Sequence, residues 1–167
     1  MRVEVREATE SDHATVAGWW VSFFAHLRKH GGDPLFEGAE LDEAGALDQL
    51  RERLGAGSFV TIATIDGRDA GYLIGKTMAP HVRESPVKLV GHVSQCWVEP
   101  WARQRGVARA LVADAEARFR AQGIGWIQLS HQAGNLGAAQ SWRALGFQPF
   151  LIQRGRPIPS LKDQADP

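Results

Sequence analysis

The chain has 167 residues, 44% of them hydrophobic, and its 19 basic side chains equal its 19 acidic ones. A formal charge of zero gives no overall field to attract nucleic acid or an anionic membrane, so neither is an expected partner. The single cysteine, Cys96, excludes an internal disulfide and a cysteine-based metal cluster. The charged N-terminus and the lack of an apolar run of about 20 residues favour a soluble, cytoplasmic protein. We expect one domain over residues 1–155 and a polar tail over residues 156–167.

The first elements of the chain are a strand and a long amphipathic helix. Val3 and Val5 alternate with charged residues, which predicts the strand. Thr9 and Asp12 then form a variant of the capping box, a pattern typical of a helix start. The helix is expected to end near Gly31, and its apolar residues recur at helical spacing: Val16, Trp19, Trp20, Phe23, Phe24 and Leu27.

Glycine and proline divide the rest of the chain into helices and strands. Asp66 and Gly67 are expected to join two strands, because this pair suits the tight turn of a hairpin. The elements expected after the first helix are a helix at 41–54, strands at 59–65, 70–78 and 87–98, a helix at 105–122, a strand at 124–130, a helix at 136–145 and a last strand at 147–153. This order predicts an α/β (α+β) fold, in which one mixed sheet carries helices on both faces.

The segment from residue 98 to residue 112 is the most informative part of the chain. A strand stops at Pro100, a basic turn follows, and a helix then begins. A helix start presents backbone N–H groups without partners and carries partial positive charge. Gly106 and Ala108 have almost no side chain, so a phosphate can approach the backbone there, although both would equally suit tight packing of the helix on the sheet. The arginines that add positive charge at the turn are Arg103, Arg105 and Arg109.

The same residues carry a family resemblance. The run 103–108 fits the pattern (Arg/Gln)-x-x-Gly-x-(Gly/Ala), with Val98-x-Pro100 before it and Leu145-Gly146-Phe147 after it. In these motifs, and in element order over residues 2–153, the chain resembles the GNAT acyltransferase superfamily. The resemblance implies a single-domain fold with a mixed, mostly antiparallel, twisted sheet. It also implies direct acetyl transfer from acetyl-CoA to a primary amine of a small molecule or peptide in a ternary complex, no metal, and a possible homodimer.

The resemblance further implies where the acetyl-CoA lies. Its pyrophosphate would sit on the backbone amides of residues 104–108, and its pantetheine arm would bond to backbone groups near Cys96 and Val98. Asn135 matches a position that contacts the cofactor, and it could equally cap the helix that follows, without conflict between the two roles. The residues implied to bind the cofactor are Cys96, Val98, Arg103, Gln104, Arg105, Gly106, Val107, Ala108, Asn135 and Trp142.

Two residues are candidates for the base that deprotonates the amine. His92 lies where relatives often carry a glutamate or histidine base, and a histidine with a pKa near about 6.5 is mostly neutral at pH 7. In a regular strand His92, Ser94 and Cys96 would share one face. The alternative is a histidine that only fills the sheet surface. Glu99, beside the turn, is the second candidate, and its alternative role is a carboxylate that only bonds to backbone or arginine.

The chain departs from the family where the leaving thiolate is protonated. Many relatives place a tyrosine at the position of Trp142, and an indole N–H does not give up its proton at neutral pH. The only tyrosine, Tyr72, is not an obvious substitute, which leaves water, Ser141, a substrate group or an unassisted thiolate. Cys96 allows an acyl-cysteine intermediate, against the alternative of a small buried residue.

The acceptor region is expected in the first two helices and the loop between them. Its aromatic residues and carboxylates could hold a cationic amine, or could be core and solvated loop respectively. A pair of histidines four residues apart, His26 and His30, has no third ligand, so no metal is expected. The alternative function is a non-catalytic module that binds or senses acyl-CoA, and a longer acyl donor or a hydroxyl acceptor also stays open. The residues considered for the acceptor are Trp19, Trp20, Phe23, Phe24, Asp33, Phe36, Glu37, Glu40 and Asp42.

Overall fold

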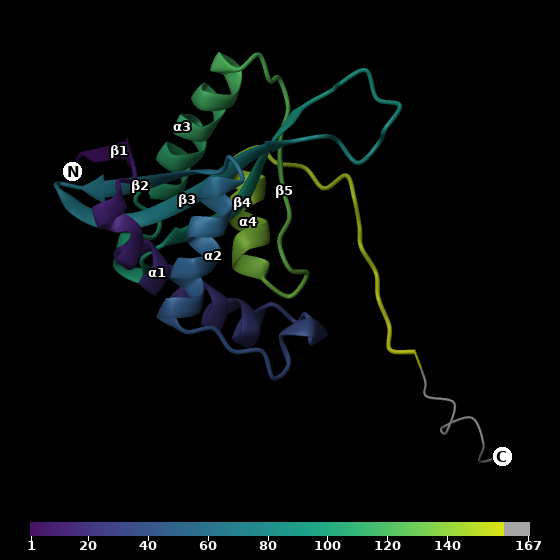
Figure 1. Ribbon diagram of the computed structural model, residues 1–167, viewed down its shortest axis with the longest axis horizontal. Helices are drawn as coiled ribbons and strands as arrows, with labels where there is room; N and C mark the ends of the chain where they lie inside the picture. Colours follow the sequence, from purple (N-terminus) through teal and green to yellow (C-terminus); the bar gives the residue numbers. More distant parts are fainter. Residues whose placement is uncertain (159–167) are drawn as a thin grey trace.

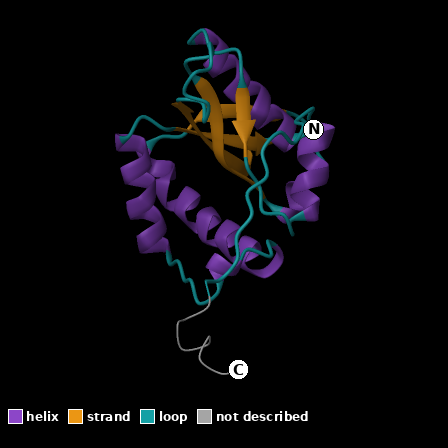
Figure 2. Cartoon of the chain, turned by 90° about the vertical axis from the view of Figure 1, so that its right-hand side faces the viewer, coloured by secondary structure: helices purple, strands orange, loops and turns teal. Residues whose placement is uncertain are grey.

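A computed structural model describes residues 1–158, and it places one five-stranded sheet between helices on both of its faces (Figures 1 and 2). The strand order is β1-β2-β3-β4-β5; the first four strands are antiparallel and β5 runs parallel to β4. This confirms the predicted mixed, mostly antiparallel sheet. Most of the polar tail expected at 156–167 lies outside the described residues. The strands are β1 (Val3–Glu7), β2 (Phe59–Ile65), β3 (Arg68–Met78), β4 (Val90–Val98) and β5 (Ile127–Leu129).

The helices divide between the two faces of the sheet. In Figure 1, α1 and α2 lie on one face and α3 on the other. The α3 face is also the side on which Trp142 of α4 packs. The helices are α1 (His13–His30), α2 (Glu43–Gly55), α3 (Val107–Ala121) and α4 (Leu136–Ala144), with short 3-10 turns η1 (Glu10–Asp12), η2 (Pro34–Phe36) and η3 (Pro100–Ala102).

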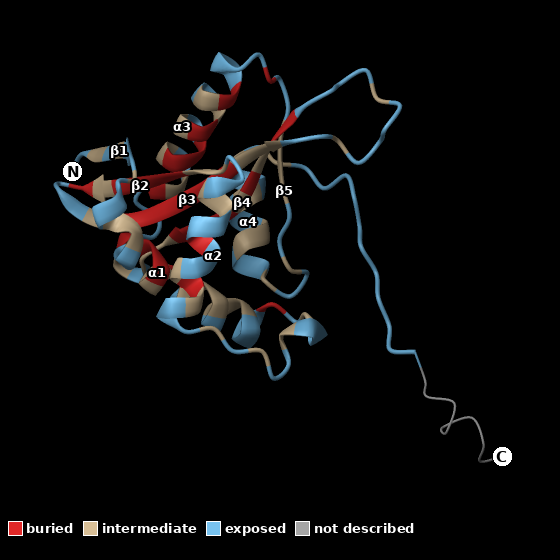
Figure 3. Cartoon of the chain, viewed as in Figure 1, coloured by how far each residue is buried: buried red, intermediate tan, exposed pale blue. Residues whose placement is uncertain are grey.

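Each face of the sheet has its own apolar core (Figure 3). On one face, Leu111 and Phe119 of α3 pack on Leu73 of β3. On the other, Trp20 of α1 and Leu50 of α2 pack against the strands. All five side chains are at most 3% exposed, and burial on this scale is the main favourable contribution to folding. Because β3 alternates between the cores, it is a central strand with both faces covered, as its almost unbroken run of buried residues requires.

β4 contains a bulge that decides which way its side chains point. Its register against β3 passes from Gln95 opposite Ile74 to Val93 opposite Gly75, so Ser94 is an extra residue on β4. Val93 packs in the α3-side core, whereas Gln95 bonds to Tyr72 on the α1/α2 side. The expectation that residues 92, 94 and 96 share one face is therefore wrong, because an extra residue shifts the alternation of a strand by one.

The bulge also marks the end of the pairing between β4 and β5. The parallel ladder covers only residues 91–93 of β4, opposite 127–129 of β5. Beyond Val93, β4 pairs with β3 alone among the elements of residues 1–158. The hydrogen-bonded pairing of the two strands thus ends at the bulge, and we call the unpaired stretch beyond it the gap between β4 and β5.

The hairpin turn agrees with the sequence, and the last strand does not. Asp66 and Gly67 both have positive φ, 48° and 81°, as the tight hairpin turn requires. The prediction of a strand at 147–153 is wrong, because these residues form a loop (Figure 2). Pro149 lacks the N–H that a ladder needs, and the apolar run that predicted the strand is exposed.

Other predicted bounds shift by a few residues. The helix expected from Arg105 begins at Val107, because Gly106 has a left-handed backbone that cannot continue into a helix. The strand expected from Val87 begins at Val90. The strand expected at 124–130 is confined to 127–129, the length that finds a partner on β4.

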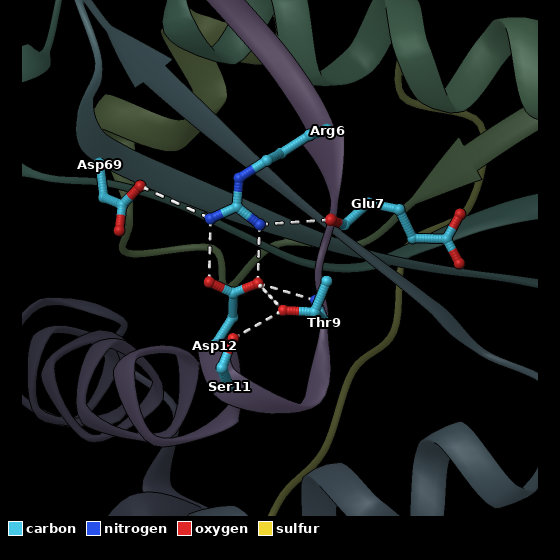
Figure 4. Close-up of polar contacts among 6 residues, drawn as sticks. All are labelled: Arg6, Glu7, Thr9, Ser11, Asp12 and Asp69. Carbon is cyan, nitrogen blue, oxygen red and sulfur yellow. Dashed lines mark hydrogen bonds and ion pairs between the residues drawn. The ribbon is translucent and has the colours of Figure 1, made fainter.

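An ion pair fixes the junction between β1 and α1 (Figure 4). The Arg6 guanidinium donates to both carboxylate oxygens of Asp12, at 2.6 and 2.9 Å. Asp12 also accepts from the backbone N–H of Thr9 at 2.7 Å, which is the reciprocal bond of the predicted capping box. The hydrogen bond from Arg6 is the largest effect on the pKa of Asp12 and lowers it well below its usual range. Burial opposes this shift, and the hydrogen bonds from Thr9 add to it.

We expect Asp12→Asn to lower the free energy of unfolding by about 1 kcal/mol at pH 7. A depressed folded-state pKa stabilises the fold fully above the unfolded value of about 3.9, and that contribution is lost as the pH falls below it. The difference between variant and wild type should therefore shrink from pH 7 to pH 3, measured by urea unfolding. Asp48→Asn, which alters an exposed pair with Arg51, is the control and should change little at either pH. A constant difference at both pH values would contradict the assignment.

Candidate active site

The turn before α3 leaves the N-terminus of that helix open. Gln104 and Gly106 both have positive φ, 59° and 83°, and no side chain caps the helix. The first helical hydrogen bond runs from the Ala110 N–H to the Gly106 carbonyl at 3.0 Å, so the N–H groups before it are the free donors of a helix start. A Cβ on Gly106 would meet no heavy atom within 4 Å. The glycine is thus needed for its backbone conformation and not for close packing, and the space in front of the turn is open.

The three arginines of this turn do not all point the same way. Arg103 folds back: its Nε donates to the Val98 carbonyl at 3.1 Å, and its guanidinium lies 5.0 Å from the centre of the Trp97 ring. Arg103 therefore covers the end of β4 in this structure. Arg105 and Arg109 are exposed at the first turn of α3. Their expected contact with a phosphate, like that of Arg103, stays a prediction.

Cys96 and Val98 lie on the α3 side of β4, beside the gap. Both pack against the α3-side core. Burial raises the pKa of the Cys96 thiol to about 12, so the thiol is neutral at physiological pH. Because the thiolate is the nucleophile, this environment favours the structural role of Cys96 over an acyl-cysteine.

His92 lies on the opposite side of the sheet from Cys96. Its neighbours Gly91 and Val93 face α3, since a Cβ on Gly91 would meet the Phe119 ring and Val93 packs in that core. His92 therefore faces the α1/α2 side. Its Nδ1 is buried without a hydrogen-bond partner in the described part of the chain. Burial lowers the pKa of His92, and the charges of Lys76 and Arg53 lower it further.

A cluster of rings occupies the α1/α2 side at the end of β4. Trp97 meets the rings of Phe23 and His26, with centroids 6.3 and 5.9 Å apart. Its Nε1 donates to the Glu99 carboxylate at 3.4 Å. Burial lowers the pKa of His26, as do the charges of His30 and Arg103, whereas a side-chain hydrogen bond with Asn135 raises it. His26 was not among the residues expected at the site. Its position, one helical turn after Phe23, indicates that both rings lie on the same side of α1.

Asn135 is confirmed as the cap of α4. Its Oδ1 accepts from the backbone N–H of Ala138 at 3.2 Å. The loop that carries it is tied to the end of α1, because the Gly134 N–H donates to the Gly31 carbonyl at 2.9 Å. A Cβ on Gly134 would lie 2.7 Å from that carbonyl oxygen, so the approach requires a glycine. The end of α1 and the loop after β5 thus hold Asn135 in place across the gap from β4.

Trp142 of α4 and Tyr72 of β3 lie on opposite faces of the sheet. Trp142 packs edge-on against Phe147, with ring centroids 5.7 Å apart, within the α3-side core. Tyr72 is buried on the other face and donates from its hydroxyl to Gln95 at 2.8 Å. Burial raises the pKa of Tyr72 well above its usual value, so it holds its proton.

The region expected to wall the acceptor is partly core. Trp20 is buried, and Trp19 stacks on Tyr72 with ring centroids 6.0 Å apart. Two of the four carboxylates are used by the backbone: Asp33 accepts from the Leu35 N–H and Asp42 from the Gly45 N–H. The other two, Glu37 and Glu40, are exposed on the loop between η2 and α2.

Comparison with known proteins identifies the family. A profile described as "Acetyltransferase (GNAT) family" matches residues 12–147. The curated "GCN5-related N-acetyltransferase 4, chloroplastic" of Arabidopsis thaliana is 28% identical over 134 residues, which are 77% of this chain and 46% of that protein. The chain therefore spans less than half the length of this relative. No helix within residues 1–158 combines the length and apolar character needed to cross a bilayer.

Solved structures show the same fold. The aminoglycoside N-acetyltransferase AAC(6')-Iy in complex with CoA superposes with a TM-score of 0.71 at 20% identity, over 93% of this chain and 96% of that one. The same enzyme with a bisubstrate analogue, CoA-S-monomethyl-acetylneamine, gives a TM-score of 0.66 at 20% identity, over 94% and 100%. A GCN5-related N-acetyltransferase from Ralstonia eutropha JMP134 gives 0.65 at 24% identity, over 94% and 99%.

The lone cysteine allows a direct test of its environment. We expect Cys96 in the native protein to react with iodoacetamide at pH 8 at least about tenfold more slowly than in urea, because a pKa of about 12 leaves almost no thiolate. The mass increase of the intact protein with time measures the reaction. Equal rates in both states would contradict the buried, neutral thiol.

Proposed function

The chain belongs to the GNAT acetyltransferase family, and from that premise we propose that it transfers an acetyl group from acetyl-CoA to a primary amine of a small molecule or peptide, by direct attack in a ternary complex. The observation that carries the proposal is the uncapped, open N-terminus of α3 at Gly106, beside the gap between β4 and β5. A phosphate fits such a helix start because free N–H groups and the helix dipole both favour an anion.

The residues present fit a diphosphate-bearing thioester. The backbone N–H groups of residues 104–108 would hold the pyrophosphate, with Arg105 and Arg109 supplying charge from the exposed side of the turn. The pantetheine would lie along β4 past Ser94, where no strand within residues 1–158 pairs with the edge that faces β5. Backbone groups near Cys96 and Val98 would bond to it there. When bound, acetyl-CoA supplies the activated acetyl group; the protein supplies position and proton transfer.

His92 is the proposed base. An alkylammonium has a pKa near about 10.4, so an acceptor amine must lose a proton before it can attack. The lowered pKa of His92 keeps its ring neutral at pH 7, and the unpartnered Nδ1 leaves an acceptor for that proton, directly or through water. Glu99 is the weaker candidate, since its carboxylate already accepts from Trp97.

The proton for the leaving thiolate has no obvious protein source. Tyr72 is engaged with Gln95 on the far face, and the Ser141 hydroxyl donates to the Gly137 carbonyl at 2.9 Å. We propose that water supplies this proton, or that the thiolate leaves unprotonated, because a thiol of pKa about 8.5 is an acceptable leaving group.

The absence of an acid at Trp142 also supports a second candidate, a module that binds acyl-CoA without turnover. A screen of amines with acetyl-CoA, read by release of free thiol, separates the two. The enzyme releases thiol with at least one amine, whereas the module binds CoA saturably in calorimetry and releases none.

Ala108→Glu tests the phosphate site without weakening the helix. A carboxylate in the first turn of α3 interacts favourably with the helix dipole, so the melting temperature should not fall. The same carboxylate would repel the pyrophosphate, and we expect the Kd for CoA in calorimetry to rise at least about tenfold. Ala113→Glu places the same charge on an exposed position in the middle of α3 and should leave the Kd unchanged. Equal affinities of the two variants for CoA would contradict the proposed pyrophosphate site at residues 104–108.

His92→Gln tests the base. In the wild type, kcat/KM should fall on the acid side with an apparent pKa below 6.5, because protonation of His92 removes the base and its pKa is lowered. The variant should lose about 10²–10⁴-fold in kcat and lose this acid limb, with the Kd for CoA unchanged. His81→Gln, in the exposed loop between β3 and β4, is the control and should keep the wild-type kcat and the acid limb. Retention of the acid limb in His92→Gln would exclude this residue as the base.

A further inference from the structure

Two cations lie on the α1/α2 face next to His92 and are not used in the mechanism above. Lys76 is the register partner of His92 across the β3–β4 ladder, so the two side chains stand side by side. Lys76 points to the same face as His92, since its neighbour Thr77 bonds to Gln122 at the end of α3 on the other side. The second cation, Arg53, comes from the last turn of α2.

Arg53 reaches over this face from α2. Its guanidinium lies 4.8 Å from the centre of the Trp20 ring, and its charge acts on both His92 and Tyr72. Arg53 therefore lies on the same α1/α2 face of the sheet as His92. Burial is the largest cause of the lowered pKa of His92, and the charges of Lys76 and Arg53 lower it further.

Neither cation has an acidic partner within residues 1–158. The ion pairs of the described chain involve other residues, and Lys76 and Arg53 take part in none of them. Glu52 lines a surface hollow on α2 together with Arg53 and forms no ion pair with it. Both positive charges are thus left for an anion that binds on this face.

Within residues 1–158, the four carboxylates considered for binding a cationic acceptor form no ion pair with these two cations. Asp33 and Asp42 already accept backbone hydrogen bonds at helix starts. Glu37 and Glu40 lie exposed on the loop between η2 and α2. The charges that act on the proposed base are thus those of two cations, whereas the carboxylate directly after β4, that of Glu99, accepts from the Trp97 Nε1–H.

We propose that the acceptor is a small amine that also carries a carboxylate, which Lys76 and Arg53 hold while the amine meets His92. This inference rests on the proposed acetyl transfer and names its substrate class. The same two charges disfavour the ammonium form of the amine that they neighbour, which assists its deprotonation. They oppose a polyamine or an aminoglycoside, because each further ammonium adds repulsion.

The test compares acceptors that differ in one charge. The probes are ω-amino acids of two to six carbons, each paired with the diamine of the same length, with neamine as a polycationic probe. Thiol release from acetyl-CoA gives kcat/KM for each. We expect the wild type to prefer the amino acid at the favoured length by at least about tenfold, and the preference to fall about tenfold in Lys76→Gln. Lys76→Glu should reverse it.

Two further variants separate binding of the carboxylate from a structural role. Loss of a structural contact would lower kcat/KM for amino acid and diamine alike, whereas loss of a carboxylate contact lowers their ratio. Arg53→Gln should lower the ratio and Arg53→Lys should restore most of it. Lys88→Gln, in the exposed loop before β4, should keep the wild-type ratio.

The outcomes also separate this inference from the acetyl transfer on which it rests. Equal or faster reaction of diamines or neamine in the wild type overturns the substrate class and leaves the transferase standing. An unchanged ratio in Lys76→Gln and Arg53→Gln does the same. No thiol release with any amine, while CoA still binds, overturns the transferase and the inference together.

Discussion

The bulge at Ser94 is the constraint on which the rest of the site depends. One extra residue in β4 lies directly after the last residue that pairs with β5, and it shifts the side-chain alternation of the strand. The shift turns Cys96 and Val98 toward α3 while Trp97 and His92 face α1 and α2. This local irregularity thus places the residues of the proposed donor site and the proposed base on opposite sides of β4.

The positive charge on the two sides of β4 comes from different groups. On the α3 side the charge is the partial positive charge of a helix start, which its free backbone N–H groups carry. Burying these groups costs less free energy than burying a full ion. On the α1/α2 side it is carried by Lys76 and Arg53, whose charges add to the effect of burial in lowering the pKa of His92. Arg103 lies between them, on Trp97 and the Val98 carbonyl, and closes the end of β4 rather than the phosphate turn. In the proposed transfer, which has no tyrosine acid at Trp142, the charges of Lys76 and Arg53 would favour loss of the amine's proton.

The sequence predicted those features that depend on a few neighbouring residues. The hairpin turn at Asp66, the capping box at Asp12, the cap at Asn135 and the turn at Gly106 each follow from local backbone chemistry. The features it did not predict depend on pairing with distant segments. The bulge appears only when β4 is set against β3, and the strand expected at 147–153 fails because alternation and apolar character cannot show that a partner strand is missing. The direction of Arg103 is set by the Trp97 ring, which no spacing rule reveals.

The buried polar atoms without partners point to the same place as the motifs do. Within residues 1–158 four such side-chain atoms occur, and two of them, His92 Nδ1 and Ser94 Oγ, lie on β4 at or next to the bulge. A third, Gln132 Oε1, lies in the loop that leads to Asn135. Since an unpaired buried polar group costs about 1–3 kcal/mol, a fold retains several together only where something else satisfies them. Only Thr61 on β2 stands apart from the gap. In the proposed transferase, a bound substrate or its water would complete the hydrogen bonding of Ser94 Oγ, in the bulge, and of His92 Nδ1.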